Sequence, residues 1–225
     1  MSKKIAKINA SKEALKFVQN GMIVGLGTGT TAKIFINLLG KKISEKFQIT
    51  GMPTSIETKK QAEKLGIKLI DINDKKTIVL AIDGADEVSP QKNLIKGLGG
   101  AFLREKIVEK KADNLIIIVD ESKMVKKLGK GILPIEVDKE KYLEIVPKIE
   151  AYGCSTKLRK ENNGDIFKTD NGNFIYHCKF DKEITNAIKL ETELMAINGV
   201  IDTGLFINMA NMIIIGNKEG TTIID

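Results

Sequence analysis

Short apolar runs alternate with segments of helical period between residues 21 and 120, and this alternation constrains the fold more than any other feature. The runs GMIVGLG, TIVLAI and NLIIIVD are continuously apolar, which is typical of strands buried on both faces. Amphipathic segments at 30–46, 55–66 and 101–112 separate them. Strands that alternate with helices favour a parallel sheet covered by helices on both faces. We therefore expect an α/β fold built on a Rossmann-like parallel sheet.

The pattern changes near residue 131. From there the sequence predicts a strand at 131–137, a helix at 140–153, a hairpin across 165–180 that turns at Asp-Asn-Gly, a helix at 183–198 and a strand at 200–206. This order is typical of a small ferredoxin-like α+β module. The last apolar runs, at 211–224, are expected to return to the first sheet. We expect a Rossmann-like catalytic domain at 1–130 plus 206–225, and an inserted α+β domain at 131–205.

The N-terminal segment predicts a helix at 11–20 with Ser11 as its N-cap. The residues before it lack the apolar core of a secretory signal. No run reaches the ~18 consecutive apolar residues that a membrane span requires. We therefore expect a cytoplasmic protein without a membrane partner.

Several classes of chemistry lack the residues they need. Cys154 and Cys178 are the only cysteines and have no metal-ligand spacing, so we expect reduced thiols and no zinc site. His177 is the only histidine, it lies in a strand-like run, and no GxSxG accompanies it, which argues against a histidine-based triad. The net charge is +7, but lysines are interleaved with acids and aromatics are scarce. This favours small anionic substrates over nucleic acid.

The glycine-rich stretch GLGTGTTAKIF lies between a predicted strand and a predicted helix. Such a loop presents backbone N–H groups at the positive end of a helix, which suits phosphate, and Thr28, Thr30 and Thr31 add hydroxyl donors. It lacks the Gly-Lys-Ser/Thr of a Walker loop. Gly27, Gly29 and Ala32 fit the loose dinucleotide fingerprint, but the next strand carries no acid for a ribose. The plainer explanation is a tight turn that needs glycine.

The stretch DGADEV places Asp83, Asp86 and Glu87 directly after an apolar strand. A metal site, a solvated loop and catalytic carboxylates explain these acids equally well. The stretch KGLGGAFLREKIV then offers Lys96, a glycine turn and Glu105 at the start of a helix. Alone, Glu105 could be a helix-dipole partner and Lys96 a solvated lysine. Lysines here and in DESKMVKKLG would also compensate the acids or hold an anion.

Taken together, GLGTGTTA, DGADE, KGLGGAFLREKIV, SKMVKKLG and LPIEV resemble the ordered motif set of type A ribose-5-phosphate isomerase. The resemblance runs from about Lys7 to the C-terminus and includes DNGN and GVIDTGLF. Five motifs in order are far more specific than any one of them. One departure is visible, because Leu98 stands where the family pattern has a glycine. This departure raises the question of whether residue 98 needs a special backbone geometry.

The resemblance implies interconversion of D-ribose 5-phosphate and D-ribulose 5-phosphate, with a sugar phosphate as the only small-molecule partner, no cofactor and no metal. It implies that Glu105 is the carbon-proton base, that Asp83 opens the ring and shuttles hydroxyl protons, and that Lys96 stabilises the oxyanion. Asp86 would orient sugar hydroxyls, so the three acids would belong to an active site. The implied substrate-binding residues are Thr28, Gly29, Thr30, Thr31, Asp83, Gly84, Ala85, Asp86, Lys96, Gly97, Leu98, Gly99, Lys123 and Lys7. Family members form dimers or tetramers, so we expect a homodimer or homotetramer.

Two other functions are compatible with parts of this motif pattern. The sugar-phosphate-sensing domain of a repressor would share the broad fold, but the roughly 20 residues before the first predicted strand are too few for a helix-turn-helix. A dinucleotide-dependent dehydrogenase fails on the missing ribose-binding acid. The sequence therefore predicts the isomerase, with the sensor as the alternative.

Overall fold

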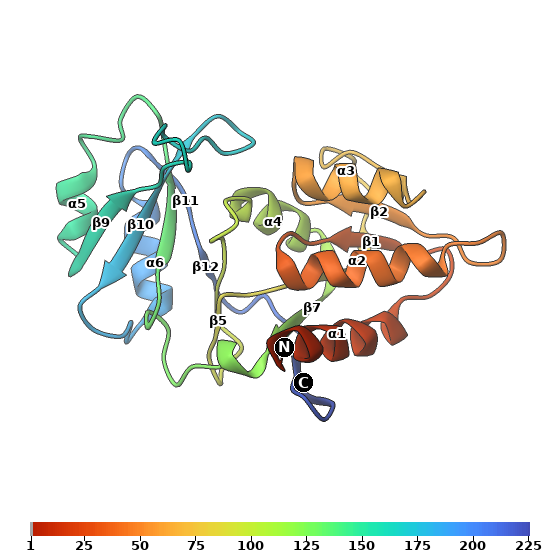
Figure 1. The fold of residues 1–225 in the computed structure, drawn as a ribbon. Coiled ribbons are helices and arrows are strands. Elements are labelled where there is room, and N and C mark those ends of the chain that lie inside the picture. The colour runs from red at the N-terminus through yellow and green to blue at the C-terminus, as the bar shows by residue number, and fades with distance from the viewer. Residues whose placement is uncertain (1) are drawn as a thin grey trace. The chain divides into compact units, whose positions relative to one another are not determined.

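The computed structural model describes residues 2–225, which form two compact units. The first unit comprises residues up to Ala85, Arg104–Met124 and Asn208–Asp225, and the second comprises Asp86–Leu103 and Val125–Ile207. Figure 1 shows the elements of both units.

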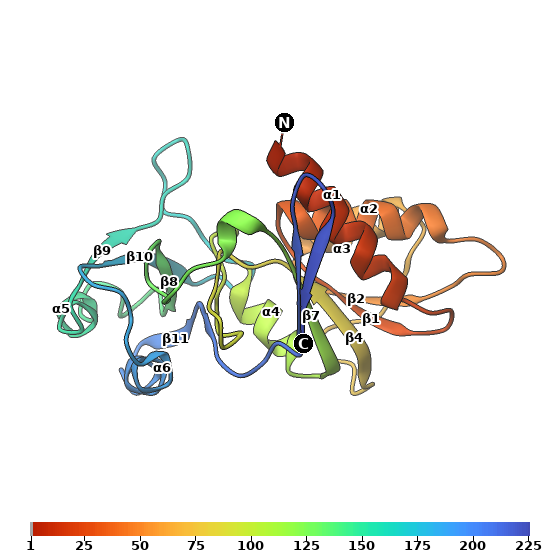
Figure 2. The ribbon, with the colours of Figure 1, turned by 90° about the horizontal axis from the view of Figure 1, so that it is seen from below.

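The first unit is built on a seven-stranded sheet in the order β14-β13-β7-β4-β1-β2-β3. All neighbouring pairs are parallel except β13 with β14, which closes the sheet as an antiparallel hairpin beside α1 (Figure 2). The strands are β1 (Ile23–Leu26), β2 (Thr50–Pro53), β3 (Lys68–Leu69), β4 (Ile78–Asp83), β7 (Ala112–Asp120), β13 (Met212–Gly216) and β14 (Thr221–Ile224). The Rossmann-like sheet and the return of the C-terminal strands to it are confirmed.

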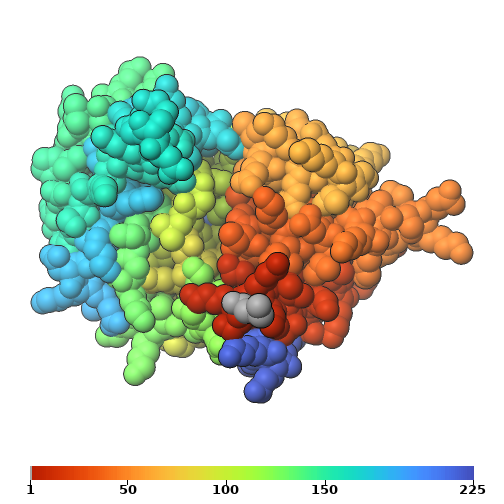
Figure 3. Space-filling view, in the orientation of Figure 1, coloured from red at the N-terminus to blue at the C-terminus, as the bar shows by residue number. Residues whose placement is uncertain are grey.

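Helices cover both faces of this sheet, as continuous apolar strands require. On one face the core joins strand residues to apolar side chains of α1 (Ser2–Ala14), α2 (Thr30–Lys42) and α3 (Ile56–Lys64). On the other face Val108 of α4 (Phe102–Glu109) packs with Met52 and Ile78. The segment between α2 and β2 projects from the surface as a loop closed by a bridge between Ser44 and Phe47 (Figure 3).

The second unit contains a four-stranded antiparallel sheet in the order β11-β8-β10-β9. Its elements follow one another as strand, helix, strand, strand, helix, strand, which is the ferredoxin-like order. They are β8 (Leu133–Val137), α5 (Val146–Glu150), β9 (Cys154–Leu158), β10 (Phe174–Phe180), α6 (Ala187–Met195) and β11 (Val200–Thr203). One sheet face and the two helices enclose the apolar core of this unit.

A small three-stranded sheet also belongs to the second unit. It pairs β12 (Leu205–Phe206) with β6 (Leu94–Ile95), and β6 with β5 (Glu87–Val88). Because Ile95 and Leu205 join the same apolar core as the four-stranded sheet, residues 86–103 are part of this unit. The unit is therefore larger than the module expected at 131–205, whose bounds stay a prediction.

Three details differ from the sequence-based expectation. The first helix begins at Ser2, and Ser11 is no N-cap but a buried interior residue whose hydroxyl donates to the carbonyl of Lys7 at 2.7 Å. The hairpin partner of β10 is β9, whereas residues 165–168 form no strand beyond one bridge at Ile166. The helix expected at 140–153 is only the short α5, because turns occupy the residues before it.

Candidate functional site

The glycine-rich loop connects the end of β1 to the start of α2. Gly29 precedes α2 with a φ of 110°, a left-handed value that favours glycine. The hydroxyl of Thr28 lies 2.7 Å from the hydroxyl of Thr54 and 2.8 Å from that of Ser55. These hydrogen bonds hold Thr28 in place. The loop therefore has a fixed backbone at the N-terminus of a 13-residue helix, where an anion is stabilised.

Lys7 reaches this loop from α1. Its ammonium donates to the hydroxyl of Thr30 at 2.7 Å. Thr31, in the first turn of α2, is mostly buried. The structure thus brings together the threonines of the loop and one of the two lysines that the sequence assigned to the phosphate.

Asp83 ends β4, which pairs with β1 in parallel. The side chain is 1% exposed, and its Oδ1 accepts from the backbone N–H groups of Thr28 at 3.0 Å and Gly84 at 2.6 Å. A Cβ at Gly27 would lie 2.1 Å from the same Oδ1. Glycine at position 27 is therefore required for Asp83 to contact the glycine-rich loop.

Two further predicted residues belong to the first unit. Glu105 lies on α4 and is 3% exposed. Lys123 ends a short 3₁₀ turn (Glu121–Lys123) that follows β7 and is capped by the carboxylate of Asp120. Since β7 pairs with β4, Lys123 follows the carboxyl end of the strand next to that of Asp83. Ligands of open α/β sheets bind at this edge.

The other predicted residues belong to the second unit. The backbone N–H of Asp86 donates to the carbonyl of Ile95, and the Asp86 carboxylate accepts from the N–H of Leu98 at 3.0 Å. Lys96 is 2% exposed, and its N–H donates to the carbonyl of Gly204 at 2.9 Å. Hydrogen bonds donated by backbone N–H groups thus join Asp86 of DGADE to the segment that carries KGLGG.

The backbone of the glycine turn shows whether residue 98 needs a special geometry. Gly97 and Gly100 have φ values of 104° and 88°, and a Cβ at Gly97 would meet the ring of Phe102 at 2.4 Å. Leu98 is not among the residues with positive φ. A leucine at this position therefore fits the turn without backbone strain.

Glu87 corrects the expectation that all three acids belong to an active site. Its Oε2 accepts from the N–H of Gly129 at 2.8 Å, and its Oε1 accepts from the N–H of Gly131. The side chain is 5% exposed. Because both carboxylate oxygens are occupied by backbone donors, Glu87 fixes the loop before β8.

Sequence reasoning missed the residues that hold the predicted ones in place. Thr54, Ser55 and Thr58 surround the hydroxyl of Thr28. Gly204 holds the backbone of Lys96, and the motif GVIDTGLF was the available signal for it.

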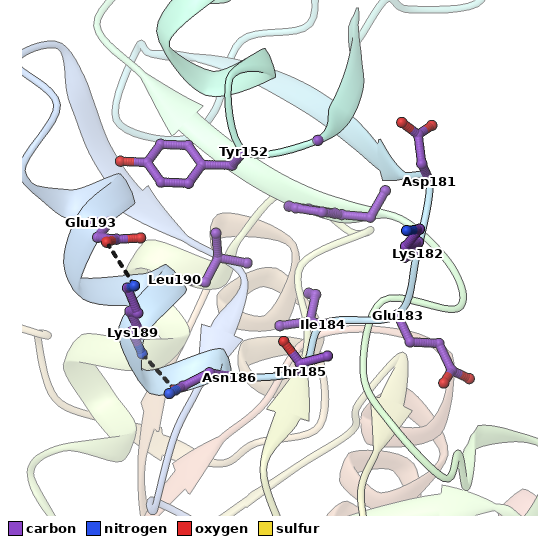
Figure 4. Close-up of a pocket in the computed structure, with 12 residues that line it drawn as sticks. Tyr152, Asp181, Lys182, Glu183, Ile184, Thr185, Asn186, Lys189, Leu190 and Glu193 are labelled. Carbon is purple, nitrogen blue, oxygen red and sulfur yellow. Dashed lines mark hydrogen bonds and ion pairs between the residues drawn. The ribbon is translucent and has the colours of Figure 1, made fainter.

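A cavity of about 470 Å³ lies elsewhere in the second unit and is lined by none of the predicted residues (Figure 4). Its wall includes Ile184, Leu190 and the ion pair between Lys189 and Glu193, whose atoms are 3.8 Å apart. The lysine side chain of that pair is well exposed, so the pair contributes little to stability.

Within residues 2–225, no three or more histidine, cysteine or acidic side chains group in a way that could hold a metal ion. In the same range, no helix is both long and apolar enough to span a membrane.

A parallel sheet that carries a glycine-rich loop, an acid and a lysine after neighbouring strands is typical of α/β proteins that bind a small anionic ligand. Comparisons with known proteins show to which family within this class the chain belongs. The family model of ribose 5-phosphate isomerase A (phosphoriboisomerase A) matches residues 50–220.

Relatives and solved structures match over nearly the whole chain. The chain is 46% identical to ribose-5-phosphate isomerase A of Bacillus mycoides over 211 residues, covering 94% of this chain and 95% of the relative. It is 41% identical to the Staphylococcus aureus enzyme, covering 99% and 98%. The structure of the Methanocaldococcus jannaschii isomerase superposes with a TM-score of 0.94 at 38% identity, covering all of both chains.

A further D-ribose-5-phosphate isomerase, solved in complex with phospho-erythronic acid, superposes with a TM-score of 0.93 at 40% identity and covers 100% of this chain and 99% of its own. The chain belongs to the ribose 5-phosphate isomerase A family, whose members are aldose–ketose isomerases.

Proposed function

We propose that this chain interconverts D-ribose 5-phosphate and D-ribulose 5-phosphate through an enediolate, as a step of the non-oxidative pentose phosphate pathway. Family membership over nearly the full chain supports this reaction. A relative that binds phospho-erythronic acid supports a phosphorylated sugar chain as the ligand. The sensor alternative is not favoured by these relatives.

The chemistry requires one base that carries a proton between two carbons. We assign this role to Glu105, whose carboxylate removes the proton from carbon 2 of the aldose and returns it to carbon 1. The burial of Glu105, at 3% exposure, supports the role because proton transfer benefits from a site that excludes water.

The hydroxyl protons need a second group. We assign ring opening and proton shuttling between the two sugar oxygens to Asp83, and the orientation of sugar hydroxyls to Asp86. The N–H donors of Thr28 and Gly84 hold the Asp83 side chain in one orientation, which supports a role that depends on geometry. Lys96 supplies the positive charge that stabilises the developing oxyanion.

The phosphate is assigned to the glycine-rich loop. Thr28 to Thr31 surround the N-terminus of α2, whose backbone donors and dipole favour an anion. Lys7 and Lys123 add positive charge, and the bond from Lys7 to Thr30 supports the first of these assignments. The substrate-binding set further includes Gly84, Ala85, Gly97, Leu98 and Gly99.

The observation that carries the proposal is the direct bond between the glycine-rich loop and Asp83, because it joins the phosphate-binding element to a proposed proton-transfer group. Purified protein mixed with ribose 5-phosphate should form ketose without added cofactor. Binding of ribose 5-phosphate without any ketose would instead favour a sensor. We further propose a cytoplasmic location and a homodimer or homotetramer, both on the basis of the family.

A further inference from the structure

The side chain of Lys96 is buried, and its ammonium group lies against the aromatic ring of Phe206. It is 2% exposed, and its Nζ lies 4.9 Å from the centroid of the Phe206 ring. Phe206 is fully buried. A cation this close to an aromatic face is attracted by the negative potential of the ring, and the attraction is stronger when water is excluded.

Backbone hydrogen bonds fix the segment that carries Lys96 relative to the segment that carries Phe206. Strand β12 pairs with β6, so Phe206 is opposite Leu94 and Leu205 is opposite Ile95. The N–H of Lys96 donates to the carbonyl of Gly204, and a Cβ on Gly204 would lie 2.3 Å from the Lys96 carbonyl oxygen. The ring and the ammonium are therefore carried on two segments that cannot shift independently.

We propose that Phe206 is a positioning residue for Lys96, holding its ammonium in place for the oxyanion of the enediolate. This inference rests on the proposed role of Lys96. Burial alone disfavours an ammonium, and attraction to the aromatic face offsets part of that penalty.

Phe206→Leu tests the proposal because it keeps an apolar side chain but removes the aromatic face. We expect kcat to fall about 10- to 30-fold, with KM changed less than threefold, as removal of one buried cation–π contact implies. Phe174→Leu is the matched control, since Phe174 is a buried phenylalanine of the same unit that packs edge-on against Tyr142. That variant should keep the wild-type kcat.

Graded fluorination of Phe206 separates the role of the ring charge from packing. Mono-, di- and trifluorophenylalanine have nearly the same shape as phenylalanine but progressively weaken the negative face. A stepwise decrease of kcat along the series supports the proposal. Wild-type kcat throughout the series, in folded protein, would overturn it.

A double-mutant cycle with Lys96→Met separates this inference from the assignment of Lys96. If Phe206 acts through the ammonium, Phe206→Leu should have no further effect on kcat in the Lys96→Met background. An equal effect in both backgrounds would overturn the inference alone. Full activity of Lys96→Met would overturn the assigned role of Lys96 and the inference with it.

Discussion

The backbone N–H of Thr28 donates a hydrogen bond to Oδ1 of Asp83 at 3.0 Å, across two neighbouring parallel strands. This bond fixes the glycine-rich loop and the acid loop relative to each other. It exists only because residue 27 has no side chain, since a Cβ there would lie 2.1 Å from the same oxygen.

Gly27→Ala should therefore displace Asp83 and the loop by a fraction of an ångström to an ångström. We expect kcat/KM to fall by about 10²-fold, the effect of a misplacement of this size. Gly220→Ala is the matched control, because a Cβ there meets no atom within 4 Å. Steady-state kinetics of both variants checks the prediction, and wild-type kinetics of a folded Gly27→Ala protein would contradict it.

Thr31→Val should mainly weaken substrate binding. The substitution keeps the shape of a mostly buried residue and removes one hydroxyl donor from a site that has several backbone partners. Loss of one hydrogen bond to a charged group costs about 1.5–3 kcal/mol, which raises KM by about 10- to 150-fold. An unchanged KM with a collapsed kcat would show that Thr31 acts in the chemical step instead.

Activity should not depend on a metal ion. The loop that carries Lys96 also donates the N–H of Leu98 to the Asp86 carboxylate. We therefore propose that Lys96 supplies the positive charge that a metal ion would otherwise provide. We expect wild-type kcat after incubation with EDTA and removal of the chelator by gel filtration. Complete loss of activity that one divalent metal restores would contradict the mechanism.

The stability of the second unit should depend on Glu136. Burial raises the pKa of this carboxyl, and Asp202 raises it further, while hydrogen bonds from Asn173 and Thr169 act in the opposite direction. The folded protein thus binds up to one proton more than the unfolded chain between the ordinary value of 4.5 and the raised pKa. The free energy of unfolding therefore falls as pH rises through this window, by at most about 1.4 kcal/mol per pH unit.

Glu136→Gln should remove this contribution, because an amide keeps an acceptor oxygen for Asn173 and Thr169 and has no charge to bury. Urea unfolding of both proteins between pH 4.5 and 8 measures the difference. The variant should gain stability relative to the wild type as pH rises. A constant difference across that range would contradict the raised pKa.

The sequence was sufficient where local pattern and tertiary structure agree. Continuous apolar runs such as NLIIIVD specified buried parallel strands, and the ordered loops specified the family. The sequence was insufficient where a contact between residues far apart in the chain determines the role of a side chain. Glu87 looks like its neighbouring acids, yet Gly129 and Gly131, more than 40 residues away, make it structural.

Contacts that the sequence does not reveal also explain why the hairpin and the start of the first helix were predicted at the wrong positions. Residues 165–168 alternate like a strand, but β9 takes the place beside β10 and leaves them only one bridge. Ser11 looks like an N-cap, but α1 continues past it because Ala6, Ala10 and Ala14 bury one helix face. Leu98 could not be judged from sequence, since its negative φ is known only from the folded turn.

The central claim is that Glu105 carries the carbon-bound proton, and Glu105→Gln tests it most directly. Glutamine is nearly isosteric but cannot accept that proton at neutral pH. We expect kcat to fall by about 10²- to 10⁴-fold. Binding of a phosphorylated sugar acid should persist, because the phosphate is assigned to other loops.

The decisive measurement is the incorporation of solvent deuterium at carbon 2 of ribose 5-phosphate, followed by NMR in the wild type and in Glu105→Gln. The wild type should incorporate deuterium during turnover, and the variant should lose incorporation in proportion to kcat. Wild-type rates of deuterium incorporation in the variant would remove Glu105 from the mechanism and make Asp83 the candidate base.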